Sequence, residues 1–513
     1  MAQKSIAKNT LFLTFRMLLL MGITFFTSRV VLDKLGVEGY GIYNVVSSLA
    51  VSFSFFISSL TNATQRFITI EIGKGNHKQA KRIFNQHLEI YFFIALGCFI
   101  IGEIAGVWFI QNKLNIPHDR ITDAIWVFQF ALLTIVVSLL TIPSESCVIA
   151  HEDMNVYSYV GVMEGIVKLF IAYLITVSPF NKLIFYAILM FLASSLSQSF
   201  YILYARLHYI ECRIQRIWDI KLLKQSFSFI SWNILGTARA AIITQGMDFV
   251  LNVFLGPIAN AARAVTNQVD GAIFRFSSNL MIATQPQLVK SYAQGDMENL
   301  HHLFFKATRF SFYVLWLLIC PFLFCIDSIL HLWLKVVPQW TEYFLFWELL
   351  SSLVYVLTKP LWSLILALGK LERYVIYDTI TSVLSVPIAI VLLELGYSPV
   401  LVYVTIFIVQ FLNTYALLVV VRSYIHFSFS RYFKEVIIQF SRVVIVGLLL
   451  MYLLSNVVET KGLWVFVYYP IGLIITGTTI FYIGMNADEK MMVKNKFGNI
   501  FLNGVIKDEN YFF

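Results

Sequence analysis

The stretch Leu35-Gly-Val-Glu-Gly-Tyr-Gly-Ile-Tyr-Asn44 follows the first long apolar run of the chain. A related stretch, Leu255-Gly-Pro-Ile-Ala-Asn-Ala-Ala-Arg-Ala264, occurs near the middle of the chain, again after a long apolar run. In both places the Leu-Gly pair marks the point where one apolar run ends and the next begins. The two motifs therefore predict a chain made of two halves with similar architecture, a pattern known from membrane proteins with internal repeats.

The composition places this chain in a lipid bilayer. Of its 513 residues 58% are hydrophobic and 13% are charged, and the mean hydropathy is +0.75. A soluble protein has about a quarter charged residues, so most of this surface must face lipid. The net charge of +9 does not indicate nucleic-acid binding, because the Lys and Arg residues lie in short loops between apolar runs. In such loops basic residues set the membrane topology.

Long apolar runs predict fourteen transmembrane helices, since each run has about the 20 residues needed to cross a bilayer. Helices are expected because lipid offers no partners for backbone polar groups, and the runs are much longer than the strands of a barrel. The expected segments are 9–32, 40–63, 86–110, 122–147, 156–178, 182–205, 226–254, 258–284, 307–331, 341–367, 375–395, 399–421, 437–458 and 463–484.

Basic residues also predict the orientation and the domains. They are far more numerous in the loops on the side of the N-terminus, so we expect both termini in the cytoplasm. The basic stretch 206–225 is expected to be a cytoplasmic linker, lying on the membrane or solvated as a loop. It separates an N-terminal six-helix bundle at 1–205 from a second bundle at 226–421. Residues 422–513 then hold the last two helices and a cytoplasmic tail.

Polar residues within the apolar segments are the candidates for function, because an ionisable group in hydrocarbon is costly. Arg263, Asn267 and Asp270 are spaced by four and three residues, so they share one face of a helix. This face predicts a hydrated central cavity, or alternatively an Arg–Asp pair that fastens helices together. Asp248 lies on a polar face of the preceding segment, and Arg239 points elsewhere on a straight helix.

Other intramembrane charges have a local partner or lie near a helix end. Glu164 and Lys168 are four residues apart in the order that favours an ion pair. That pair is either self-neutralising or responsive to ions, and Asp248 and Asp270 are further candidates for ion coupling. Arg29 stands four residues before Asp33 and can pair with it or snorkel, as Arg16 can near the inner surface. The excess of cations favours an anionic substrate such as a phosphate.

Motifs of several other protein classes are absent from the sequence. There is no Gly-x-x-x-x-Gly-Lys-Ser/Thr phosphate loop, no metal-ligand cluster and no catalytic triad that spacing could support. The five cysteines have neither metal-site nor disulfide spacing. We therefore expect no enzyme activity, cofactor or metal. A membrane polysaccharide polymerase or ligase stays a weaker alternative, because the predicted outer loops are short.

The stretch from Ser28 to Asn44, with its Leu-Gly-x-x-x-Tyr-Gly-x-Tyr element, resembles the Wzx-type polysaccharide flippases. These belong to the multidrug/oligosaccharidyl-lipid/polysaccharide (MOP) exporter superfamily. The resemblance implies two six-helix bundles in a V around a cavity that opens to each side in turn. It implies transport of an undecaprenyl-pyrophosphate-linked oligosaccharide from the inner to the outer leaflet of a bacterial cytoplasmic membrane, alongside other polysaccharide assembly proteins.

The resemblance also implies residue roles. In the related lipid II flippases, cavity arginines on helices 1, 2 and 8 bind the pyrophosphate, and by helix position Arg16, Arg29, Arg66 and Arg263 match them. The full set expected to bind substrate comprises Arg16, Arg29, Arg66, Arg239, Arg263, Asn267 and Arg275. An ion-coupled multidrug exporter of the same superfamily is the main alternative. Such an exporter should carry acidic residues in its first helix, where this chain has arginine.

Overall fold

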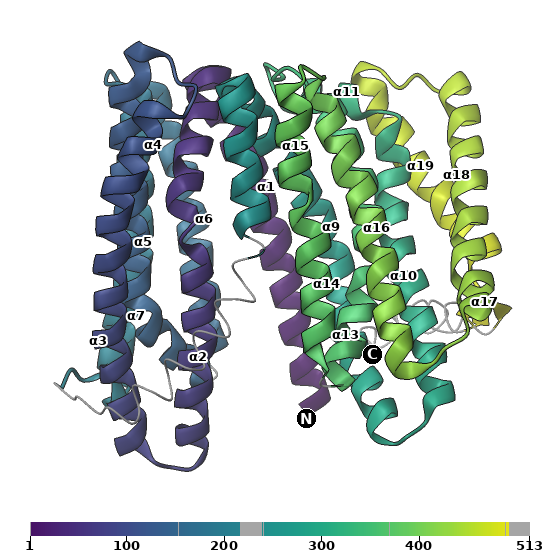
Figure 1. Cartoon of the computed structure of the whole chain (residues 1–513), viewed down its shortest axis with the longest axis horizontal. Coiled ribbons are helices and arrows are strands. Elements are labelled where there is room, and N and C mark those ends of the chain that lie inside the picture. The colour runs from purple at the N-terminus through teal and green to yellow at the C-terminus, as the bar shows by residue number, and fades with distance from the viewer. Residues whose placement is uncertain are drawn as a thin grey trace, which may run out of the picture. The chain divides into compact units, whose positions relative to one another are not determined.

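The computed structural model describes residues 2–151, 153–215, 239, 241–368, 370–487 and 489–491, and its regular elements there are helices (Figure 1). Ten of these helices are long and apolar enough to cross a membrane. A further candidate is a pair of helices, Met17–Val51 and Ser54–Gly73, bent by 44°. The all-α polytopic membrane class predicted from the sequence is confirmed.

The expected segments 9–32 and 40–63 both fall on the bent pair, and two further expected segments are not among these candidates. The segment expected at 226–254 lies partly outside the described residues, and its described part is the shorter apolar helix Ala241–Leu255. The segment expected at 258–284 corresponds to α9 (Pro257–Ala293), which carries Arg263, Asp270 and Arg275. The count of fourteen crossings and the cytoplasmic position of both termini stay predictions.

The chain forms two compact units, of which the first comprises residues 1–268, 333–344 and 379–409. In this unit α5 packs against α2, α3 and α7 (Figure 1). The unit contains α1 (Ala2–Val51), α2 (Ser54–Gly73), α3 (His77–Ile101), η1 (Gly102–Gly106), α4 (Val107–Asn112), η2 (His118–Arg120), α5 (Ile121–Ala150), α6 (Met154–Val177), α7 (Lys182–His208), η3 (Ile210–Cys212), Ala241–Leu255, the start of α9 and α15 (Ser385–Glu394).

The second unit comprises residues 269–332, 345–378 and 410–513. Its core is rich in aromatic side chains, among them Phe304, Phe305, Phe427 and Tyr432, which lie within one buried cluster. It contains the rest of α9, α10 (Met297–Leu323), α11 (Ile326–Trp333), α12 (Thr341–Tyr355), α13 (Thr358–Leu368), α14 (Leu371–Val383), α16 (Pro399–Ile425), α17 (Phe429–Tyr432), η4 (Phe433–Ile437), α18 (Ile438–Val457), η5 (Gly462–Trp464), α19 (Val465–Thr479) and η6 (Ile480–Gly484), of which α11, α12, α14 and α16 also have residues in the first unit.

The two Leu-Gly motifs have the same backbone geometry. Gly36 has a φ of 73° and interrupts α1, while Gly256 has a φ of 76° and separates Ala241–Leu255 from α9. Glycine suits both positions because other residues rarely adopt a positive φ. The motifs also touch, since a Cβ on Gly41 would lie 1.9 Å from the carbonyl oxygen of Pro257. The sequence repeat thus has a structural counterpart within the first unit.

The beginning of the predicted linker is docked onto the first unit. The amide of buried Asn85 on α3 donates to the carbonyl of Arg213 at 3.2 Å and accepts from the backbone N–H of Gln215 at 2.6 Å. Tyr209 donates to Asp153, and burial together with this carboxylate raises the pKa of the tyrosine phenol. Residues 216–225 lie outside the described part, so the expected domain boundaries stay predictions.

Candidate functional site

Arg263 lies at the centre of a buried polar network in the first unit. Its Nε donates to Asp248 Oδ1 at 2.6 Å, and its two terminal nitrogens donate to the hydroxyl of Tyr403 and the carbonyl of Thr244. The other oxygen of Asp248 accepts a hydrogen bond from Ser48 at 2.6 Å. The side chain of Arg263 is 7% exposed, so the protein itself supplies the partners of this cation.

Asparagine side chains extend the network toward the loop after α4. Asn260 donates to the backbone carbonyl of Asp248 and accepts from Asn252, whose oxygen in turn accepts from the backbone N–H of Asn115 at 2.9 Å. These contacts join the second half of α1, the helix Ala241–Leu255 and α9. A buried polar network in which the members satisfy one another rigidifies its surroundings. The sequence left open an Arg–Asp pair that fastens helices together. The structure contains such a pair, and the partner of Arg263 in it is Asp248.

A second polar region of the first unit follows one face of α1. Phe25, Arg29 and Asp33 recur every four residues and therefore form a stripe on that helix. Asp33 pairs with Lys335 at 2.9 Å and with Lys34 at 3.5 Å, so lysines take the carboxylate that the sequence offered to Arg29.

The aromatic end of the same stripe is also covered. Trp333 donates from Nε1 to the backbone carbonyl of Phe25 at 2.8 Å, and the two rings meet edge to face at 4.8 Å. Arg29 lies one helical turn from each of these two contacts. It is half-buried, and within the described part of the chain it has no hydrogen bond or ion pair. No described residue therefore competes with a ligand for its guanidinium.

Helix α9 meets α1 beside Arg29. Gln268 donates to the hydroxyl of Ser28 at 2.8 Å and to the carbonyl of Thr24 at 3.2 Å. The neighbouring Asn267 is exposed and makes no hydrogen bond to any described residue. Arg29 and Asn267 thus flank one helix contact, and the polar groups of both are unused by the described residues. We define these two residues with Phe25, Asp33, Trp333 and Lys335 as the α1 stripe site.

Four other predicted binding residues are not brought into the α1 stripe site by any contact among the described residues. Arg16 lies on α1, and its side chain is outside the described residues. Arg66 is exposed on α2, and Arg239 donates to the hydroxyl of Ser382 at 3.0 Å. Arg275 is exposed on the part of α9 that belongs to the second unit, and it has no partner in the part of the chain that the structure describes.

The residues predicted for ion coupling occupy three separate environments. Glu164 and Lys168 form the expected ion pair on α6 at 2.7 Å, and about a third of each side chain is exposed. Asp248 belongs to the Arg263 network. Asp270 accepts a hydrogen bond from Ser352 at 2.6 Å in the second unit. The described residues contain no group of three or more His, Cys, Asp or Glu side chains that could hold a metal ion.

One buried arginine was not singled out from the sequence. Arg309 on α10 is 2% exposed, donates to the backbone carbonyl of Glu435 at 2.9 Å and pairs with Glu489. Arg309 therefore resembles Arg263, because each is a buried cation whose partners come from the protein itself, Arg309 in the second unit and Arg263 in the first. The polar spacing around Arg309 gave no signal, because its partners follow more than a hundred residues later.

Comparison with solved structures identifies the fold. The lipid II flippase MurJ in an inward closed conformation superimposes with a TM-score of 0.66 and 14% identity, covering 91% of this chain and 99% of that chain. An inward-facing multidrug resistance MATE transporter of the MOP superfamily gives 0.58 at 13% identity, covering 82% and 95%. A mutant of the Vibrio cholerae MATE transporter VcmN gives 0.56 at 14% identity, covering 84% and 98%.

Sequence comparison adds a relative of about half coverage. The membrane protein EpsK of Bacillus subtilis (strain 168), itself uncharacterized, is 19% identical over 283 residues. The match covers 54% of this chain and about half the length of that protein, 55%. No protein family model matches the chain. The chain has the fold of the MOP-superfamily transporters.

Proposed function

We propose that this protein is a flippase that moves a lipid-linked oligosaccharide from the inner to the outer leaflet of a bacterial cytoplasmic membrane. The observation that carries the proposal is Arg29, a half-buried cation on a membrane helix with no partner in the described part of the chain. A charge kept in such a position usually marks a substrate pathway. The fold shared with a lipid II flippase supports the same conclusion.

The chemistry of the α1 stripe site suits a pyrophosphate group attached to sugars. Within the site, Arg29 and Lys335 outweigh the single carboxylate of Asp33, and the neighbouring Lys34, which also pairs with Asp33, adds to the positive charge. The guanidinium of Arg29 has the geometry to bind phosphate oxygens bidentately. Asn267 adds both a donor and an acceptor for a phosphate or a sugar hydroxyl.

Transport itself follows from the cost of moving sugars through lipid. Sugar hydroxyls lose their water in hydrocarbon without replacement, so a polar path between helices is required. In proteins built from two halves, rocking of one half against the other opens such a path to each side alternately. We propose this mechanism here, with the lipid tail remaining in the bilayer and the N- and C-termini in the cytoplasm.

An ion-coupled exporter is the second candidate function. The similarity to MATE transporters, one of them a multidrug resistance transporter, favours it. The described part of α1 carries Arg29 and has no acidic residue before Asp33, which favours the flippase, because exported cationic drugs call for carboxylates.

A complementation experiment separates the two functions. We expect the wild-type chain to restore surface glycan and clear the accumulated lipid-linked precursor in a bacterium that lacks its own flippase. Arg29→Gln should leave the precursor inside, whereas Arg442→Gln, which changes an exposed arginine on α18, should behave as wild type. Absence of rescue by membrane-inserted wild type, together with drug efflux that Arg29→Gln does not alter, would support the exporter instead.

A further inference from the structure

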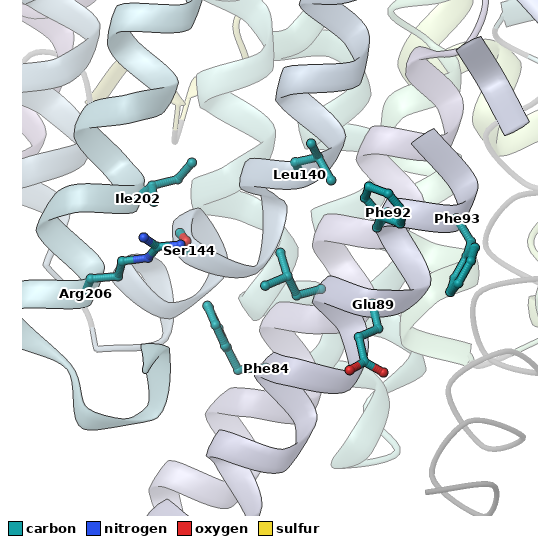
Figure 2. Close-up of a pocket in the computed structure, with 9 residues that line it drawn as sticks. Phe84, Glu89, Phe92, Phe93, Leu140, Ser144, Ile202 and Arg206 are labelled. Carbon is teal, nitrogen blue, oxygen red and sulfur yellow. The ribbon is translucent and has the colours of Figure 1, made fainter. Parts of the chain in front are cut away.

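A cavity lies in the first unit, and none of the residues that line it belongs to the α1 stripe site. It has a volume of about 730 Å³ and opens between α3, α5 and α7, as Figure 2 shows. Its walls are mostly apolar, and only three polar side chains line it. The lining residues are Phe84, Leu88, Glu89, Phe92, Phe93, Leu140, Ser144, Ile202 and Arg206. We call this cavity the α3–α7 groove.

The α3–α7 groove lies on helices long and apolar enough to cross the membrane. Arg206 is two residues from the end of α7. Phe92 and Phe93 follow Glu89 on α3, and more than half of each residue is exposed. Exposed phenylalanines on an apolar helix of this length suit contact with lipid chains, so the end of the groove at Phe92 and Phe93 can accommodate an acyl chain. Its volume falls in the range of about 300–1,000 Å³ that is usual for small-molecule sites.

The groove carries two charged side chains, Glu89 and Arg206. Neither Glu89 nor Arg206 makes a hydrogen bond or ion pair with any residue that the structure describes. Figure 2 shows Arg206 extending from α7 toward Ser144, with Glu89 across the groove on α3. One cation and one anion therefore flank the mostly apolar α3–α7 groove. Glu89 is half-buried on α3 and Arg206 is exposed near the end of α7, so a ligand carrying both charges could pair with each of them and stabilise the site.

We propose that the α3–α7 groove binds a zwitterionic phospholipid of the phosphatidylethanolamine class. Its phosphate accepts from Arg206, its ammonium donates to Glu89, and an acyl chain lies along Phe92, Phe93 and Leu140. Charge complementarity selects this ligand, because Glu89 repels a purely anionic headgroup such as phosphatidylglycerol or an isoprenoid pyrophosphate. The site is thus distinct in chemistry from the net positive α1 stripe site.

Native mass spectrometry of the full-length protein tests the proposal. The protein is released from vesicles that contain equal amounts of phosphatidylethanolamine and phosphatidylglycerol, and the retained lipids are counted. Wild type should retain phosphatidylethanolamine preferentially. Arg206→Gln and Glu89→Gln should each lower that preference by about fivefold, the upper range for one ion pair near a surface. Lys182→Gln, at the opposite end of α7, is the matched control and should change nothing.

Charge reversal makes the test directional. Glu89→Lys should turn the preference toward phosphatidylglycerol, a result that a merely misfolded variant cannot give. Equal retention of both lipids by wild type, or the same loss in the Lys182 control as in the Arg206 variant, overturns the proposal. Because lipid retention is measured without transport, the outcome is independent of whether the protein is a flippase.

Discussion

Arg263 and Arg29 lie in the same unit and were predicted to do the same work, but their surroundings differ. Arg263 is enclosed by Asp248, Tyr403 and a backbone carbonyl, whereas Arg29 has no partner among the described residues. A buried charge that the fold neutralises fastens helices, because removing one partner leaves the other uncompensated. A membrane charge without a partner is free to meet a substrate. The contrast predicts that the two arginines fail differently when mutated.

The largest effect is expected for Arg263→Ala. The substitution leaves the largely buried Asp248 carboxylate with Ser48 as its remaining side-chain donor among the described residues, which should destabilise the protein by about 3 kcal/mol. The melting temperature of the detergent-purified protein and its yield in the membrane measure this loss. The double variant Arg263→Met with Asp248→Leu removes both charges and should recover most of the stability. A stable single variant that lacks transport would mean that Arg263 binds substrate after all.

Arg29 should show the opposite pattern. Arg29→Gln is expected to leave the melting temperature unchanged and to weaken binding of a pyrophosphate-linked lipid by about tenfold or more, the value of a charge-assisted hydrogen bond. Arg29→Lys keeps the charge but not the planar fork, so it should restore only part of the affinity. Binding to the purified protein, measured at fixed salt, gives the comparison. Loss of stability in Arg29→Gln would show that this residue is structural like Arg263.

A smaller effect is expected for Asp33→Asn. The carboxylate pairs with Lys335 and Lys34, so its removal makes the α1 stripe site more positive and releases both lysines. The apparent affinity for the pyrophosphate-linked lipid should rise by up to about fivefold, since exposed ion pairs are worth at most ~1 kcal/mol. Raising the salt concentration should erase the gain. Weaker binding by this variant would place the substrate away from Asp33 and Arg29.

The sequence could predict the local features behind the contrast between Arg263 and Arg29. It could not predict contacts between residues that lie far apart along the chain. The breaks at Gly36 and Gly256 were indicated by the Leu-Gly motif itself, and the positive φ that the structure gives both glycines is a local requirement of the kind that leaves a local signal. The pairing of Arg263 with Asp248 could not be chosen over Asp270, since helix spacing fixes faces but not neighbours.

Even less in the sequence indicated that Arg29 would lack a partner among the described residues. The sequence offered Asp33 as its partner, whereas the structure gives that carboxylate to Lys335, about three hundred residues away in the chain. Only tertiary packing decides between a local and a distant cation. The α3–α7 groove has the same origin, because Glu89, Ser144 and Arg206 come from three helices that no spacing rule connects.

The smallest effect is expected for the pair of Glu164 and Lys168. This pair also tests whether the presence of a partner is enough to identify a structural charge. The two groups neutralise each other at 2.7 Å, so they should resemble Arg263 in role, but their exposure makes the pair weak. We expect Glu164→Gln with Lys168→Met to change stability by less than about 0.5 kcal/mol and to leave the pH dependence of transport unaltered. Transport assayed across pH 5.5–8 is the measurement, with each single variant as control. A shifted pH profile at unchanged stability would mean that a paired membrane charge can still take part in transport. In that case the absence of a partner would no longer distinguish a substrate-binding charge from a structural one.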